Sequence, residues 1–122
     1  MVYAKQTGKQ NIGLSVSLII FAFVCINLIF LNFYRDIWWD SSVYIGMGKY
    51  IFSLGKSGLW EESRPLILPS ILGAGWKLNL NVVYFGRAIS LIFAVLVVFV
   101  IYKLSSKLFS RKIGLLAAFF TA

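Results

Sequence analysis

The sequence predicts an all-α integral membrane protein in which transmembrane helices are joined by a long outer loop with two interfacial amphipathic helices. Three observations lead to this fold class. Hydrophobic residues other than glycine make up 60% of the 122 residues, whereas soluble domains reach only ~45–50% with glycine included. Charged residues make up 13%, against the ~25–35% of a water-exposed surface. The hydrophobic residues also gather in runs long enough to cross a lipid bilayer.

The first transmembrane helix is predicted at residues 12–33, after a basic tail of residues 1–11. This stretch of 22 residues carries no charge, and ~20 helical residues cross a hydrocarbon core of ~30 Å. The alternative is a cleavable signal peptide, whose hydrophobic region of ~7–15 residues precedes small residues. Because the run is longer and ends in Asn32-Phe33-Tyr34, we favour an uncleaved anchor.

A second transmembrane helix is predicted at residues 82–104, with Arg87 near its beginning and Lys103 near its end. A basic loop, residues 105–112, connects it to the start of a third helix at residues 113–122. This last stretch covers only about 15 Å, roughly half a bilayer, so the third helix is predicted to be truncated. Its last carbonyl groups cannot stay unpaired in lipid. We therefore expect missing downstream spans or a partner membrane subunit.

The placement of charges sets the expected orientation. Basic residues without neighbouring acids flank the predicted spans at Lys5, Lys9, Lys103, Lys107, Arg111 and Lys112. The positive-inside rule assigns these positions and the amino terminus to the cytoplasm, so residues 34–81 are expected outside the cell membrane. All four acids fall there: Asp36, Asp40, Glu61 and Glu62. No nucleic-acid partner is expected, since that would need a basic stripe on a folded domain.

The outer segment, residues 34–81, is predicted to carry two short helices. It has 48 residues, where connections typically have ~4–6, and its tryptophans and tyrosines suit the membrane–water interface. Asp40 or Ser41 is expected to cap the first helix. Four residues would lie on one face of that helix: Tyr44, Met47, Ile51 and Leu54. The helix should end at the glycines that follow, Gly55 and Gly58. The second should begin around Pro65 and Pro69 and run to about Lys77.

The residue types of the chain limit the chemistry that it can perform. It has no histidine, which excludes an imidazole base, a histidine metal ligand and a serine–histidine pair. The single cysteine, Cys25, allows neither an internal disulfide nor a zinc cage. The four acids form no recognisable ligand set, so the sequence assigns no metal site and no cofactor, and a divalent metal stays open. A base at neutral pH therefore has to be a carboxylate.

Asp40 is the candidate base, because it closely follows the first span and two tryptophans precede it; alternatively, it only caps the first short helix. Arg64 offers a donor fork suited to phosphate; alternatively, it anchors the segment to lipid headgroups. Glu61 and Glu62 are expected to cap the second short helix or to favour it through the helix dipole, unless they belong to a site. Asp36 is interpreted as a solvated rim charge.

Several short motifs follow the first span in a definite order. They are Trp39-Asp40-Ser41-Ser42-Val43-Tyr44, Arg64-Pro65-Leu66 with Pro69, Arg87 at the second span, and Phe109-Ser110-Arg111-Lys112-Ile113-Gly114. In their order and spacing the chain resembles, over residues 12–122, the amino-terminal part of the polytopic glycosyltransferases that take a sugar from a polyprenyl phosphate. This group contains the protein O-mannosyltransferases and the aminoarabinose transferases of lipid A.

The resemblance implies that Asp40 activates the acceptor group. The family carries an Asp-Glu pair, with a Tyr four residues after the Asp. Asp40 and Tyr44 match this pattern, and Ser41 stands in place of the glutamate, so a second carboxylate has no assigned role. Tyr44 is thereby a candidate substrate-binding residue.

The resemblance also implies that Arg64 faces the phosphate of a polyprenyl-phosphate-linked sugar donor. The family has a basic residue before Pro-Pro; Arg64 and Pro65 match, and Leu66 replaces the second proline. Glu61, close by in sequence, is a further candidate substrate-binding residue. The implied reaction transfers the sugar to an acceptor hydroxyl or similar group on the outer side. Because the rest of the donor and acceptor sites would lie elsewhere, we expect no turnover from this chain alone.

Two other readings stay open. A small non-enzymatic membrane anchor or accessory subunit would tolerate Asp40→Asn, whereas charges introduced at Trp38 or Ile51 would disrupt its assembly. A transporter fragment would need polar groups facing a pathway inside the membrane, which only Asn27 and Arg87 could supply.

Overall fold

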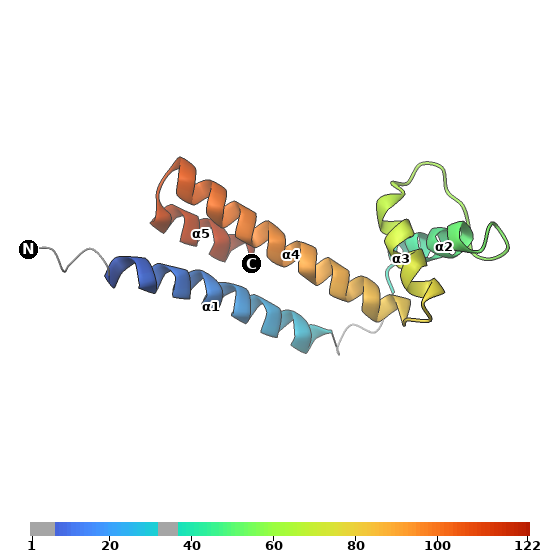
Figure 1. The fold of residues 1–122 in the computed structure, drawn as a ribbon, viewed down its shortest axis with the longest axis horizontal. Coiled ribbons are helices and arrows are strands. Elements are labelled where there is room, and N and C mark those ends of the chain that lie inside the picture. The colour runs from blue at the N-terminus through green and yellow to red at the C-terminus, as the bar shows by residue number, and fades with distance from the viewer. Residues whose placement is uncertain (1–6, 32–36) are drawn as a thin grey trace, which may run out of the picture. The chain divides into compact units, whose positions relative to one another are not determined.

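The computed structural model describes residues 7–31 and 37–122, with side chains from residue 15 onward. Over these residues the chain forms helices and turns and no strand, which confirms the predicted all-α class. The helices are α1 (Thr7–Phe30), α2 (Trp39–Phe52), α3 (Ile67–Lys77), α4 (Val82–Leu108) and α5 (Arg111–Thr121) (Figure 1). The start of the predicted basic tail, the end of the predicted first span and Asp36 lie outside the described residues.

The chain divides into two compact units. The long-helix unit consists of Met1–Tyr34 and Leu91–Ala122, and so contains α1, α5 and most of α4. The short-helix unit consists of Arg35–Ser90 and contains α2, α3 and the first turns of α4. All four acidic residues of the sequence belong to the short-helix unit.

Helix α4 is the one described helix that is long and apolar enough to cross a membrane, judged by length and composition. Its 27 residues correspond to about 40 Å, and it continues one turn beyond the predicted end at Leu104. In α1, the described apolar stretch is Ser15–Phe30, which is too short to meet the same test. The described residues therefore contain one candidate span, and the first predicted span, which extends beyond Ser15–Phe30 on both sides, stays a prediction.

Helix α1 satisfies its own polar side chain. The Asn27 amide donates a hydrogen bond to the carbonyl oxygen of Phe23, one turn earlier, at 2.9 Å. This bond pairs one donor of the amide within its own helix, so Asn27 has less need of a polar partner across the membrane. This bond weakens the transporter reading, which relied on Asn27.

The segment predicted as a basic loop, residues 105–112, is almost entirely helical. Helix α4 runs to Leu108 and α5 begins at Arg111, so only Phe109 and Ser110 connect them. The Ser110 hydroxyl accepts a hydrogen bond from the backbone N–H of Ile113 at 3.4 Å and caps α5. The loop prediction was wrong because lysine and arginine are good helix formers, and neither glycine nor proline interrupts residues 87–113.

Helix α5 folds back on α4 through Gly114. A Cβ atom at this position would collide with the Ser106 hydroxyl and lie 2.9 Å from the carbonyl oxygen of Tyr102. Gly114 and Ala118, one turn apart on α5, are both buried. Helix α1 also contacts α5. The missing side chain at Gly114 thus lets the backbones of α4 and α5 approach closely at this point.

Helices α2 and α3 pack against each other at a contact between Gly48 and Gly73. A Cβ atom at Gly48 would lie 2.5 Å from the carbonyl oxygen of Pro69 and 2.7 Å from the backbone nitrogen of Gly73. These neighbours are backbone atoms and cannot rotate away. Met47 and Leu72 are buried in the same unit, and each contributes about 1.5–3 kcal/mol by its burial. The core of the short-helix unit is this helix pair.

Both ends of α2 differ from the prediction. Its N-cap is Trp38, which makes no side-chain cap bond, so the expectation that Asp40 or Ser41 caps the helix is wrong. Asp40 lies in the first turn, where its charge still favours the helix dipole. The helix ends at Phe52, before Leu54, whose side chain is 88% exposed and whose φ of +55° is left-handed. Leu54 is therefore not part of the buried face.

Helix α3 ends at Lys77 as predicted, and begins at Ile67 with Leu66 as N-cap. Pro69 lies in its first turn, where a missing N–H removes no helical hydrogen bond. That turn contains no acidic residue. The expectation that Glu61 and Glu62 cap this helix or favour its dipole is therefore wrong, because both precede the helix by more than a turn.

We predict that Gly48→Ala lowers the free energy of unfolding by about 1–3 kcal/mol, the usual cost of forcing extra atoms into a packed contact. The change can be measured by chemical denaturation of the full chain in detergent, followed by circular dichroism. Gly86→Ala is the matched control. A Cβ atom added at Gly86 would lie 3.0 Å from a methyl group of the Leu72 side chain, which can rotate, and near no backbone atom of another helix. A Gly48→Ala protein as stable as the control would contradict the close helix contact.

Candidate functional site

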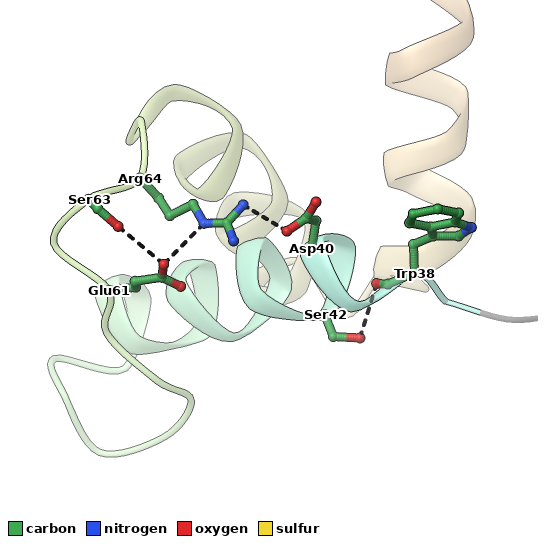
Figure 2. Close-up of polar contacts among 6 residues, drawn as sticks. All are labelled: Trp38, Asp40, Ser42, Glu61, Ser63 and Arg64. Carbon is green, nitrogen blue, oxygen red and sulfur yellow. Dashed lines mark hydrogen bonds and ion pairs between the residues drawn. The ribbon is translucent and has the colours of Figure 1, made fainter.

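Arg64 is the centre of the candidate site. It lies in the segment between α2 and α3, and its guanidinium reaches back to α2. Its Nη1 lies 2.8 Å from Oδ1 of Asp40, and its Nε lies 3.2 Å from Oε1 of Glu61. Figure 2 shows the guanidinium between the two carboxylates. One arginine thus joins the beginning of α2 to the segment that precedes α3.

Backbone contacts position this segment before Glu61. The N–H of Leu59 donates to the carbonyl oxygen of Gly46 on α2 at 3.2 Å. Gly58 has a φ of +96° and lies so close to α2 that a Cβ atom would collide with the same carbonyl. The rings of Tyr50 and Trp60 pack with their centroids 5.6 Å apart. Glu61 and Arg64 therefore follow a short stretch of chain that is fixed on α2.

Two aromatic rings of α2 flank the guanidinium. Its Cζ lies 5.4 Å from the centroid of Tyr44 and 6.0 Å from the centroid of Trp39. Tyr44 follows Asp40 by four residues, so both side chains are on the same face of α2. A cation held over aromatic rings at this distance is attracted by their negative faces. Helix α2 therefore supplies one carboxylate and two aromatic groups to a single arginine.

The positive charge of Arg64 is permanent. Hydrogen bonding with the Tyr44 side chain, then with Asp40 and Glu61, raises the pKa of Arg64 above its already high ordinary value. A raised pKa stabilises the fold at every pH below the ordinary value, and this contribution is lost only as pH rises through the raised one. Because both lie far above neutrality, this arginine adds no pH dependence to stability in the neutral range.

The two carboxylates differ in their surroundings. The Asp40 side chain is 55% exposed and contacts Arg64 through one oxygen. The Glu61 side chain is 36% exposed, and its Oε1 accepts both from Arg64 Nε and, at 3.1 Å, from the Ser63 hydroxyl. Asp40 is accordingly the carboxylate that a further hydroxyl group reaches more easily. Two negative charges and one positive charge leave the cluster with a net negative charge.

The site residues named from the sequence come together in the structure. Asp40, Tyr44 and Glu61 all contact the Arg64 guanidinium or lie against it. Sequence reasoning named Trp39 only as a neighbour of Asp40 and not as a contact of Arg64, and it missed Ser63. Glu62 is exposed, and no ion pair involves it in the described part of the chain. Among residues 7–31 and 37–122, no three His, Cys, Asp or Glu side chains gather as metal ligands would.

Comparisons of this chain with protein-family models, with curated proteins and with solved structures find no match.

We predict that Arg64→Lys lowers the thermal midpoint of unfolding of the full chain. A single ammonium group cannot present the planar fork that reaches two carboxylates through Nη1 and Nε at once. The decrease should shrink in 1 M salt, because exposed ion pairs are screened. The matched control is Arg111→Lys, at an exposed position with no partner among the described residues. Equal decreases in the two variants would show that the Arg64 contacts do not stabilise the fold.

Proposed function

We propose that this chain is the amino-terminal part of a membrane glycosyltransferase that transfers a sugar from a polyprenyl-phosphate donor to an acceptor on the outer face of the membrane. The contact between Asp40 and Arg64 carries the proposal. It brings together a carboxylate suited to act as a base and a guanidinium suited to bind phosphate. From the sequence, these two residues, 24 positions apart, were expected to act on the two sides of one reaction.

In the proposed reaction, Asp40 takes the proton of the acceptor hydroxyl, and the oxygen of that hydroxyl attacks the anomeric carbon of the sugar. The bond between that carbon and the phosphate oxygen breaks, and polyprenyl phosphate leaves with the electron pair. The exposure of the Asp40 side chain, 55%, supports access for an acceptor. A positioned base typically accelerates such a step about 10²–10⁴-fold.

Arg64 would stabilise the negative charge that develops on the leaving phosphate. Its guanidinium is already shared by Asp40 and Glu61, and this net negative cluster would repel a phosphate. We expect Glu61 to yield its place to the donor phosphate. Its contact with Arg64 is the longer one, 3.2 Å against 2.8 Å, and it lies outside the helices, whereas Asp40 is held on α2.

The proposal assigns α1 and α4 to transmembrane helices and α5 to the beginning of a third. The apolar character of α4 and of Ser15–Phe30 supports this assignment. The positive-inside rule supports a cytoplasmic amino terminus, with the short-helix unit outside the cell membrane. Trp38 and Trp39 are 79% and 74% exposed, which suits a unit that lies at the membrane–water interface, where indole rings are favoured.

We predict that Asp40→Asn, introduced at the chromosomal locus, lowers sugar transfer in isolated membranes by about 10²–10⁴-fold, the contribution of a general base. The chromosomal variant ensures that the chain is made together with any further spans or partner subunits. Transfer from a labelled polyprenyl-phosphate sugar is measured as initial rate, with protein amount checked by immunoblot.

The matched control for this prediction is Glu62→Gln, which removes one negative charge from an exposed residue of the same segment. Its transfer rate should equal that of the unmodified chain. Unchanged transfer by Asp40→Asn would overturn the assignment of the base, and with it the enzyme proposal.

We further predict that Glu61→Gln lowers KM for the polyprenyl-phosphate donor a few-fold. A neutral amide competes less strongly than a carboxylate for the Arg64 guanidinium, so the donor phosphate should enter more easily. Initial rates against donor concentration, in the same membranes, give the KM. A raised KM would show that Glu61 itself helps to bind the donor, and would contradict the exchange at Arg64.

A non-enzymatic anchor or accessory subunit is the second candidate, and the exposed indole of Trp38 favours it because a partner surface could cover that ring. In this case the contact between Asp40 and Arg64 only stabilises the short-helix unit. Asp40→Asn should then preserve function, and Trp38→Glu should abolish co-purification with the partner. Ile51 is half-buried, so a charge there would also disturb α2 and is the less specific test.

A further inference from the structure

The long-helix unit carries four exposed basic residues where α4 is followed by α5. Lys103 and Lys107 belong to the last turns of α4, and Arg111 and Lys112 to the first turn of α5. Only Phe109 and Ser110 connect the two helices, and Figure 1 shows the end of α4 beside the beginning of α5. By their sequence positions, the four cations belong to this end of the α4–α5 hairpin. We call these four residues the hairpin basic surface.

No side-chain carboxylate of the same unit can neutralise this surface, because residues 1–34 and 91–122 contain neither aspartate nor glutamate. The charges of α5 also act against their own helix, because Arg111 and Lys112 lie at the positive end of its dipole. Lys103 and Lys107 lie near the carboxyl end of α4, where the dipole favours cations, but they are like charges one turn apart. This arrangement favours an anionic partner from outside the unit.

Apolar side chains are exposed among the cations. Those of Leu104, Leu108, Phe109 and Ile113 are 55%, 65%, 71% and 45% exposed. A nucleic acid or an acidic soluble protein would leave these groups in water. The headgroup region of a bilayer suits both kinds of side chain, because apolar groups enter the acyl chains while lysine and arginine extend to the phosphates. Next to this surface, residues 91–102 of α4 carry no charge, as a segment within the acyl region requires.

We propose that the hairpin basic surface binds the headgroups of anionic phospholipids and so enriches negatively charged lipid around the α4–α5 hairpin. The inference rests on the membrane placement in the proposed function, and is independent of sugar transfer. Each lysine or arginine at a membrane surface favours anionic lipid by a factor of about five at low salt.

The test uses the full chain reconstituted in phosphatidylcholine vesicles with a trace of spin-labelled phosphatidylglycerol or phosphatidylcholine. The motionally restricted fraction in the electron paramagnetic resonance spectrum gives the relative association of the two lipids. We expect about a fivefold or larger preference for phosphatidylglycerol. The preference should fall sharply in the triple variant Lys107→Gln, Arg111→Gln, Lys112→Gln, which leaves only Lys103 of this surface, and should weaken in 1 M salt.

The matched control replaces Lys49, Lys56 and Lys77 of the short-helix unit by glutamine, which removes the same charge, and should keep the preference. Equal association of the two lipids with the unmodified chain would overturn the inference, as would loss of the preference in the control alone. Stronger displacement by inorganic phosphate than by chloride at equal ionic strength would point to free phosphate, and would also overturn it. Failure of the chain to float with the vesicles would overturn the membrane placement too, whereas a loss of sugar transfer alone would not.

Discussion

The guanidinium of Arg64, held between the carboxylates of Asp40 and Glu61, is the contact on which the arrangement of the candidate site depends. Arginine presents several N–H donors in one plane, so a single side chain can join groups from two stretches of sequence. Here it joins the first turn of α2 to the segment before α3. Without it, the carboxylates of Asp40 and Glu61 would lose the cation that they share.

Backbone packing makes this contact possible. The close approach of Gly48 to Gly73 sets the distance between α2 and α3, and the hydrogen bond from Leu59 to Gly46 fixes the intervening segment on α2. An exposed ion pair alone contributes little, because holding two long side chains together costs conformational entropy. The site is therefore better understood as the product of a tight helix pair that presents its charged groups to each other.

Much of the all-α fold follows from the sequence, because hydrophobic runs as long as those at residues 12–33 and 82–104 favour helices over strands. The end of α3 at Lys77 was also predicted. Asp40 and Arg64 were named because acids and arginines are few in so apolar a chain, and Tyr44 through the resemblance; the structure shows that they lie together, and their role stays a prediction. Local spacing could not show that Asp40 contacts Arg64, 24 positions away, instead of capping α2. That contact depends on how the segment between α2 and α3 packs against α2. Residues 105–112 were mistaken for a loop because their charge was weighed above their helix propensity.

The most direct test of this account is a double-mutant cycle on Asp40 and Arg64, with thermal unfolding midpoints measured for Asp40→Asn, Arg64→Gln and the double variant. If the two side chains act as one contact, the double variant should lose little more than the more damaging single variant. Additive losses would contradict the account, because they would show that Asp40 and Arg64 stabilise the chain through separate partners.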